Sequence, residues 1–144
     1  MKRGGRDNEF LDQLAKVPLF DGLSQKSLKK VCESAKEMHW AEGDKLTCEA
    51  TRGSRFHLVL DGEVAVESGG HRRTTLGPGA MLGEIALIDG QPRTATVIAL
   101  SPVRTLSLAS WNFRSLLREE PTIAEKVMVG LARRIRELEQ SPLP

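Results

Sequence analysis

The most informative stretch of the chain reads GEIALIDGQPRTATV, residues 83–97. A glycine leads into a short apolar turn of helix, residues 89–92 predict a tight loop, and Arg93 opens a β-rich segment. The first turn of a helix presents unpaired N–H groups and the positive end of its dipole. An arginine adds a guanidinium fork shaped for a phosphate. A small anion is therefore the predicted ligand of this stretch.

Glu84 follows the glycine directly and adds a second kind of chemistry. Acidic side chains accept hydrogen bonds from sugar hydroxyls in the nucleotide sites of other folds. Each residue has a simpler explanation when taken alone: Glu84 as a carboxylate favoured by a helix N-terminus, Arg93 as a surface arginine paired to an acid. Because a phosphate cradle and a ribose acceptor stand together in one segment, we favour a nucleotide.

The flanking sequence predicts a β-rich region between Glu37 and Leu108. Turn signals such as Asp61-Gly62 and Ser101-Pro102 recur roughly every 8–12 residues, the interval of all-β domains. The β-rich runs between them cover residues 56–60, 64–66, 94–98 and 103–108. Short strands of even spacing predict a barrel or a jelly-roll.

Helices are predicted on both sides of this region. Residues 1–8 are polar and glycine-containing and predict a flexible arm, and residues 9–35 predict helix, with Ser24 as the N-cap of its last part. Residues 110–139 predict two further helices, with Pro121 ending the first or starting the second. One apolar stripe follows the last helix: Ile123, Val127, Leu131, Ile135 and Leu138.

Composition limits the class of protein. The 144 residues suit one domain, and 40% hydrophobic with 28% charged residues can build a core. Lys+Arg 21 against Asp+Glu 19 argues against a general nucleic-acid binder. Two cysteines exclude a disulfide scaffold and a four-cysteine zinc site. Without an apolar run of about 20 residues or a secretory signal, we expect a soluble cytoplasmic protein with no membrane contact.

Two runs together resemble the phosphate-binding cassette of cyclic nucleotide-binding domains: Gly83-Glu84-x-Ala86-Leu87 and Pro92-Arg93-Thr94-Ala95-Thr96-Val97. That family includes catabolite activator proteins, protein kinase A regulatory subunits and cyclic nucleotide-gated channels. Val17-Pro18-Leu19-Phe20-x-x-Leu23 resembles the N-terminal helical segment of bacterial members, and Leu76-x-Pro78-Gly79-x-x-Leu82 resembles their approach to the cassette. The resemblance covers residues 10–140.

The fold implied by the resemblance is mainly β with flanking helices. A β-roll (double-stranded β-helix, jelly-roll) would span residues 37–108, with N-terminal helices, a short cassette helix and two C-terminal helices. Residues 9–144 would form the single cyclic nucleotide-binding domain, after the arm over residues 1–8.

The resemblance also implies the site residues. Glu84 would bind the ribose 2′-OH, and Gly83 would let the backbone approach the ligand. The cyclic phosphate would be held by Arg93, Thr94 and the N–H groups near Ile85 and Ala86. Alignment with channel members puts the base among Val66, Thr74, Leu76 and Leu82, with Arg134 over it. Many relatives carry an aromatic residue where Leu82 stands. Cyclic AMP is the expected ligand, and cyclic GMP stays open because Thr94 suits either base.

The implied function is regulation without catalysis. The ligand would close the last helix over the base and signal to a separate, unknown protein effector, with no cofactor, metal or catalytic residue. The last helix could also pair two copies of the chain. The sequence stops at residues 141–144 without a DNA-binding element, so full-length protein and fragment both stay open. Turns such as Leu76-Gly77-Pro78-Gly79 suggest a bacterial source.

Three other functions are weighed against this one. The first is the sensor part of a truncated transcription regulator. The second is a cupin-like metal enzyme, but His39, His57 and His71 contain no close His-x-His pair. The third is a degenerate roll that only mediates protein contacts.

Overall fold

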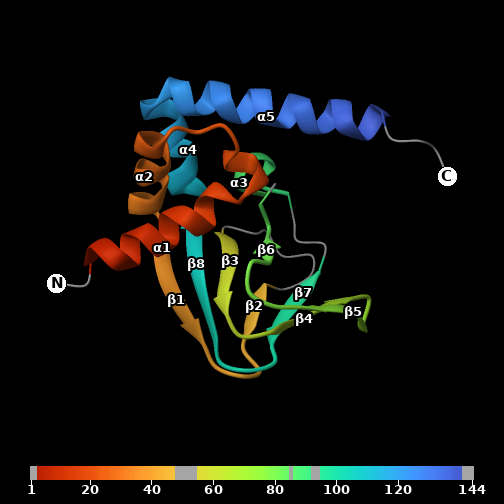
Figure 1. The fold of residues 1–144 in the computed structure, drawn as a ribbon. Helices are drawn as coiled ribbons and strands as arrows, with labels where there is room; N and C mark the ends of the chain where they lie inside the picture. Colours follow the sequence, from red (N-terminus) through yellow and green to blue (C-terminus); the bar gives the residue numbers. More distant parts are fainter. Residues whose placement is uncertain (1–2, 48–54, 85, 92–94, 141–144) are drawn as a thin grey trace. The chain divides into compact units, whose positions relative to one another are not determined.

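The computed structural model describes residues 3–47, 55–84, 86–91 and 95–140, and Figure 1 follows them along the chain. The helices are α1 (Arg3–Ala15), the 3-10 turn η1 (Pro18–Phe20), α2 (Gln25–Ser34), α3 (Ala86–Asp89), α4 (Ser110–Glu119) and α5 (Pro121–Gln140). The strands are β1 (Lys36–Trp40), β2 (Lys45–Thr47), β3 (Arg55–Asp61), β4 (Val64–Ser68), β5 (His71–Leu76), β6 (Met81–Leu82), β7 (Thr96–Ala99) and β8 (Val103–Ala109). The chain divides into a helical unit, residues 1–32 and 115–144, and a roll unit, residues 33–114.

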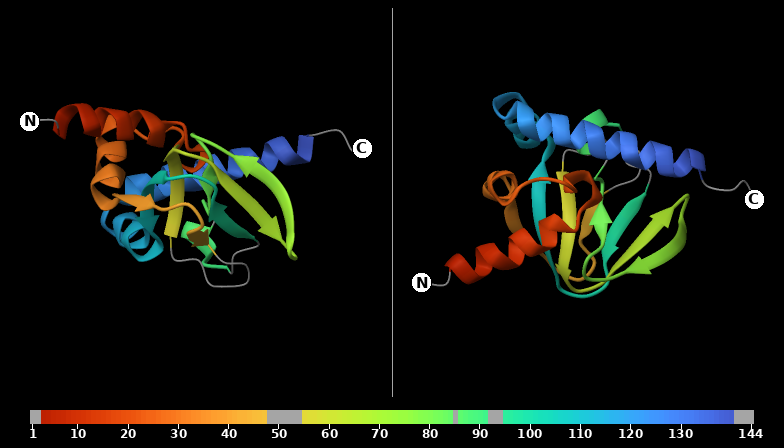
Figure 2. Two further views of the ribbon diagram at one scale, coloured as in Figure 1. Left: turned by 90° about the horizontal axis from the view of Figure 1, so that it is seen from below. Right: turned by 45° about the horizontal axis from the view of Figure 1, so that its top comes forward.

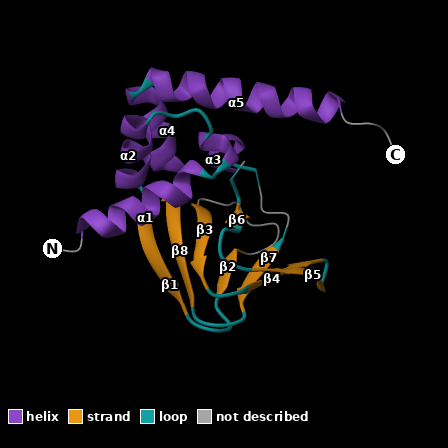
Figure 3. Ribbon diagram, in the orientation of Figure 1, coloured by secondary structure: helices purple, strands orange, loops and turns teal. Residues whose placement is uncertain are grey.

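The roll unit contains two antiparallel four-stranded sheets. Their strand orders are β1-β8-β3-β6 and β2-β7-β4-β5, so strands distant in sequence alternate within each sheet (Figure 3). β5 ends its sheet, and the β4–β5 hairpin can be followed at the margin of the roll in both views of Figure 2. The predicted mainly β roll with helices before and after it is confirmed.

The core of the roll lies between the two sheets, because both contribute to one apolar cluster. Val59 and Val103 come from one sheet, and Val64 and Val97 from the other. The rest of the cluster is Leu46, Leu82 and Ala99, with Trp40, Val66, Leu76 and Ala80 partly buried against it. This cluster holds β4 and β5 in the register that carries three of the predicted base-lining residues.

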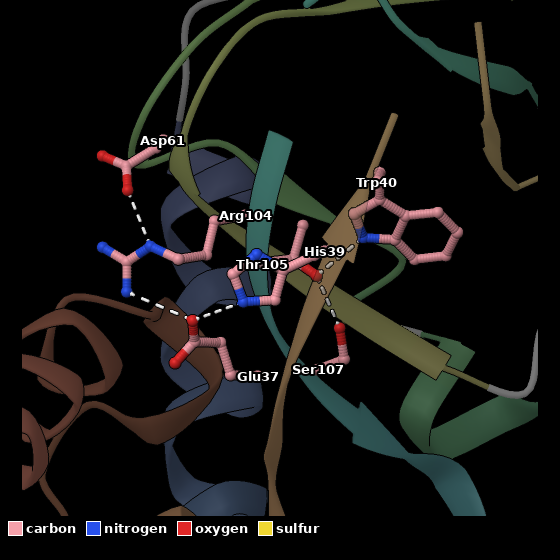
Figure 4. A network of polar contacts seen from close by, with 7 residues as sticks. All are labelled: Glu37, His39, Trp40, Asp61, Arg104, Thr105 and Ser107. Carbon is pink, nitrogen blue, oxygen red and sulfur yellow. Dashed lines mark hydrogen bonds and ion pairs between the residues drawn. The ribbon is translucent and has the colours of Figure 1, made fainter. Parts of the chain in front are cut away.

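A series of linked polar side chains lies on the face of the β1-β8-β3 sheet that also carries Val103 of the core cluster. The Trp40 indole N–H donates to Thr105 Oγ1 at 3.1 Å, and Thr105 Oγ1 lies 2.8 Å from Ser107 Oγ. His57 Nδ1 lies 2.6 Å from the same Ser107 oxygen. Figure 4 shows the part of this series from Trp40 to Ser107, beside an ion-pair group on the opposite face in which Arg104 contacts Asp61 at 2.7 Å. Strand alternation separates the two groups, since Arg104 and Thr105 are successive residues of β8.

Ser107→Ala is expected to lower the free energy of unfolding by about 1–3 kcal/mol, the cost of breaking hydrogen bonds between buried groups. Ser107 is 1% exposed and links His57 to Thr105. Urea denaturation measures the loss. Ser115→Ala, at an exposed position of α4, is the control and should change stability by no more than about 0.5 kcal/mol. An equally small change in Ser107→Ala would contradict the stabilising role of these linked polar side chains.

In the helical unit, the caps fall where the sequence predicts them. Ser24 Oγ accepts the Ser27 N–H at 3.1 Å, which confirms Ser24 as the N-cap of α2. Pro121 begins α5, which decides between the two alternatives for that proline. Lys30 of α2 pairs with Glu120, between α4 and α5, at 2.7 Å. The apolar stripe on α5 is only partly buried: Ile123 and Val127 are buried, whereas Ile135 and Leu138 are 56% and 75% exposed.

One local expectation is wrong. α1 begins at Arg3, inside the segment expected to be a flexible arm. Two glycines lowered the predicted helix content there, but propensity is a weak guide that context overrides. Trp111 of α4 is 54% exposed, with the Arg55 guanidinium of β3 5.4 Å from its ring centroid. The Trp111 ring therefore makes a cation–π contact with Arg55 at the surface.

Candidate ligand-binding site

The roll unit holds a cavity of about 280 Å³ whose walls come from five strands and the chain beside them. Its lining residues are Thr47, Val66, Thr74, Leu76, Met81, Leu82, Gly83, Ala95 and Val97. The volume lies near the lower end of the range of about 300–1,000 Å³ seen for small-molecule sites. The lining is apolar apart from two threonines, the pattern of small-molecule sites in which a few polar groups orient the ligand.

All four predicted base-lining residues line this one cavity, and so does Gly83. Strand geometry explains why. Val66 of β4 is the register partner of Thr74 on β5, so their side chains share a face. Leu76 lies two residues after Thr74 and therefore points to the same side. Leu82 reaches the cavity from β6 of the opposite sheet.

Gly83 turns the chain from β6 toward α3. Its φ is +81°, in the left-handed region where any L side chain is strained, so glycine is required at this rim of the cavity. Glu84 is half-buried, and its carbonyl accepts the Leu87 N–H at 3.3 Å. Ala86 begins α3 and is half-buried, whereas Leu87 is 1% exposed and holds the short helix against the roll.

The C-terminal end of α3 is fixed from two directions. Arg114 Nη2 donates to the Ile88 carbonyl at 3.3 Å, a favourable place for a cation because carbonyls at a helix end carry partial negative charge. Asp89 Oδ1 accepts the Gln91 N–H at 3.0 Å, which forms a local turn. These two hydrogen bonds therefore fix the position of the C-terminal end of α3, where the following loop begins.

Ile85, Arg93 and Thr94 lie outside the described residues. Ala95, which follows them, is described and lines the cavity, as Gly83 does. The segment from residue 83 to residue 95 therefore starts and ends at the wall of the same cavity. Arg134, the last predicted site residue, lies on α5 in the helical unit and is half-buried.

Four lining residues were not predicted: Thr47, Met81, Ala95 and Val97. Ala95 and Val97 are two residues apart on the β-rich run after Arg93, so period-two alternation could have found them. Thr47 is the register partner of Val97, but β2 has only three residues and carries no readable pattern.

No three His, Cys, Asp or Glu side chains in the described part of the chain come together as metal ligands. His39 instead contacts Glu37 at 2.8 Å, and His57 belongs to the series of linked polar side chains. Of the helices that the structure describes, none is both long enough and apolar enough to cross a membrane.

Known proteins are similar to this chain in the region that contains the cavity. The profile of the cyclic nucleotide-binding domain matches residues 37–120. A cyclic nucleotide-gated potassium channel of Mesorhizobium japonicum is 38% identical over 112 residues, which cover 78% of this chain and 31% of the channel. The cyclic AMP receptor protein of Thermus thermophilus is 30% identical over 125 residues, 83% of this chain and 58% of the receptor. The chain thus spans less than two thirds of each of these relatives.

A solved structure resembles nearly the whole chain. It is the N-terminal domain of a transcriptional regulator from Streptomyces coelicolor A3(2), with a TM-score of 0.84 and 30% sequence identity. The match covers 92% of this chain and 99% of that domain. The similarity therefore extends beyond residues 37–120 to the helices on either side.

Proposed function

Because the chain belongs to the cyclic nucleotide-binding domain family, we propose that it is a cyclic AMP receptor module that binds its ligand without converting it. One observation carries the proposal. The cavity holds the four residues expected around the base, and the segment expected to hold the phosphate starts and ends at its wall. The base and the phosphate belong to one small ligand, so the residues that bind them must lie at the same cavity.

The site residues take the following roles in this proposal. Glu84 accepts from the ribose 2′-OH, and Gly83 lets the backbone come close to the ligand. Val66, Thr74, Leu76 and Leu82 enclose the base. Arg93, Thr94 and the N–H groups of Ile85 and Ala86 hold the phosphate, whose single negative charge a guanidinium neutralises.

The output of the module is a movement of α5. Arg134 on this helix contacts the base, and the ligand stabilises the arrangement of α5 that permits this contact. A ligand shifts such an equilibrium only by binding one arrangement better than the other. A separate protein partner then recognises α5, whose exposed Ile135 and Leu138 offer it an apolar surface.

Calorimetric titration tests the proposal. Cyclic AMP should bind the 144-residue chain saturably, with a dissociation constant of about 1 μM corresponding to about −8 kcal/mol. Titration with cyclic GMP compares the affinity for guanine with that for adenine. Titration with 5′-AMP shows whether binding requires the cyclic form of the phosphate. Chromatography of the ligand after incubation should recover it unchanged. Absence of binding of both cyclic nucleotides at millimolar concentration would leave the roll as a protein-contact domain and overturn the proposal.

A second candidate is the sensor part of a transcription regulator. It is favoured by the similarity to the regulator domain of Streptomyces coelicolor, which extends over 92% of this chain. The mass of the protein isolated from its source cells separates the two. A mass matching 144 residues favours the module, and a larger mass that includes a DNA-binding segment favours the regulator.

A further inference from the structure

Thr47 has a hydroxyl group whose proton is already donated in a hydrogen bond within the protein. Its Oγ1 donates to the Ala95 carbonyl at 3.0 Å, and both residues line the cavity. The direction of this bond is certain because a carbonyl oxygen can only accept. A threonine hydroxyl has a single proton and two lone pairs. Toward anything in the cavity, Thr47 Oγ1 is therefore an acceptor only.

The second hydroxyl of the cavity differs. Thr74 Oγ1 lies 3.5 Å from the Thr75 carbonyl, beyond the usual range of about 2.5–3.0 Å for an O–H···O bond. Thr74 can therefore turn its proton toward a ligand or away from it, and it suits donors and acceptors alike. The remaining side chains that line the described cavity are aliphatic or, at Met81, a thioether, which is a weak acceptor. Thr47 is thus the lining side chain with a fixed hydrogen-bonding preference.

We propose that Thr47 Oγ1 accepts a hydrogen bond from the exocyclic amino group of the bound purine and so selects a base that presents an N–H donor. This inference rests on the proposed function, which brings a purine into the cavity. Adenine carries such a donor on its six-membered ring. A purine without the amino group leaves the lone pairs of Thr47 without a partner in a partly buried site, which costs affinity.

A purely structural role for Thr47 predicts a different pattern of binding. β2 pairs with β7, and the register shifts between Lys45 and Thr47. If the hydroxyl only held the two strands together, its loss would disturb the cavity for every ligand equally. If the hydroxyl contacts the amino group directly, its loss changes the affinities for ligands with and without that group by different amounts, so a cycle of protein and ligand changes separates the two roles.

The test uses calorimetric titration with cyclic AMP and with purine riboside 3′,5′-cyclic monophosphate, which lacks only the amino group. The unsubstituted chain should bind cyclic AMP about 2- to 13-fold more tightly than the analogue, the range for a neutral hydrogen bond. Thr47→Val should abolish this preference, because the acceptor that distinguishes the two ligands is gone, and Thr47→Ser should retain it. Thr75→Val, on the exposed β5 and outside the cavity lining, is the matched control and should leave both affinities unchanged.

Equal affinity of the unsubstituted chain for the two ligands would overturn the inference, and that result needs no variant to fold. An equal loss for both ligands in Thr47→Val would also overturn it and assign Thr47 to the strand contact. Both results require binding of cyclic AMP. Failure of the unsubstituted chain to bind either nucleotide would instead overturn the proposed function, and this inference with it.

Discussion

Replacing Arg93 by alanine is expected to weaken binding of cyclic AMP about 10- to 150-fold. A bidentate contact between a guanidinium and a phosphate contributes about 1.5–3 kcal/mol, because both partners are charged and the fork fixes two parallel hydrogen bonds. The cyclic phosphate carries one negative charge, so a single arginine accounts for a large part of its recognition. Calorimetric titration of the variant and the unsubstituted chain at one ionic strength gives the ratio.

Two further variants separate the shape of the Arg93 side chain from its charge. Arg93→Lys keeps the charge but loses the planar fork, so its affinity should lie between those of the alanine variant and the unsubstituted chain. Arg118→Ala removes a positive charge at an exposed position of α4 and should change affinity less than twofold. If Arg93→Ala bound cyclic AMP within threefold of the unsubstituted chain, the phosphate would be held by other groups and the assigned role of Arg93 would be wrong.

Long elements with clear end signals were predictable from the sequence. Ser24 marks the start of α2, and Pro121 marks the start of α5. The β-rich runs over residues 56–60 and 103–108 correspond to β3 and β8. β3 extends one residue further at each end, and β8 one residue further at its C-terminal end. In each case a local feature, such as a cap, a proline or a run of β-branched and apolar residues, gives the same answer as the tertiary structure.

Elements that depend on their neighbours were not predictable. β2 and β6 have three and two residues, too few for an alternating pattern, and they exist because β7 and β3 pair with them. β5 is largely exposed and rich in arginine and threonine, so its sequence has no apolar alternation. Sheet pairing decides such strands, and pairing involves residues far apart in the chain.

The same distinction applies to the site. The four positions expected around the base came from alignment with channel members, and the structure brings them to one cavity. Thr47 could not be found in this way, since its role depends on a hydrogen bond to Ala95, 48 positions later in the sequence. A residue whose role depends on a contact so distant in sequence therefore needs the structure before that role can be proposed.

Gly62→Ala is expected to destabilise the protein by about 2–6 kcal/mol. Gly62 lies between β3 and β4 with φ +93°, a conformation that costs an L residue about 1–3 kcal/mol. A Cβ there would lie 2.3 Å from the Pro102 carbonyl oxygen and 2.9 Å from Val103 Cγ2. Relieving such overlap costs about another 1–3 kcal/mol. The change in unfolding free energy can be measured by urea denaturation.

The backbone near Gly62 has little freedom to move away from this overlap. The Leu100 N–H donates to the Glu63 carbonyl at 2.9 Å, and the Glu63 N–H donates to Ser101 Oγ at 3.1 Å, so two turns are joined directly beside the glycine. Gly43→Ala is the matched control, because Gly43 has φ +90° but no atom within 4 Å of the position that a Cβ would take. Gly43→Ala should lower the free energy of unfolding only by the cost of the positive φ, about 1–3 kcal/mol. Equal losses in the two variants would mean that the turns separate readily, and the close contact between them would then contribute nothing to the stability of the roll.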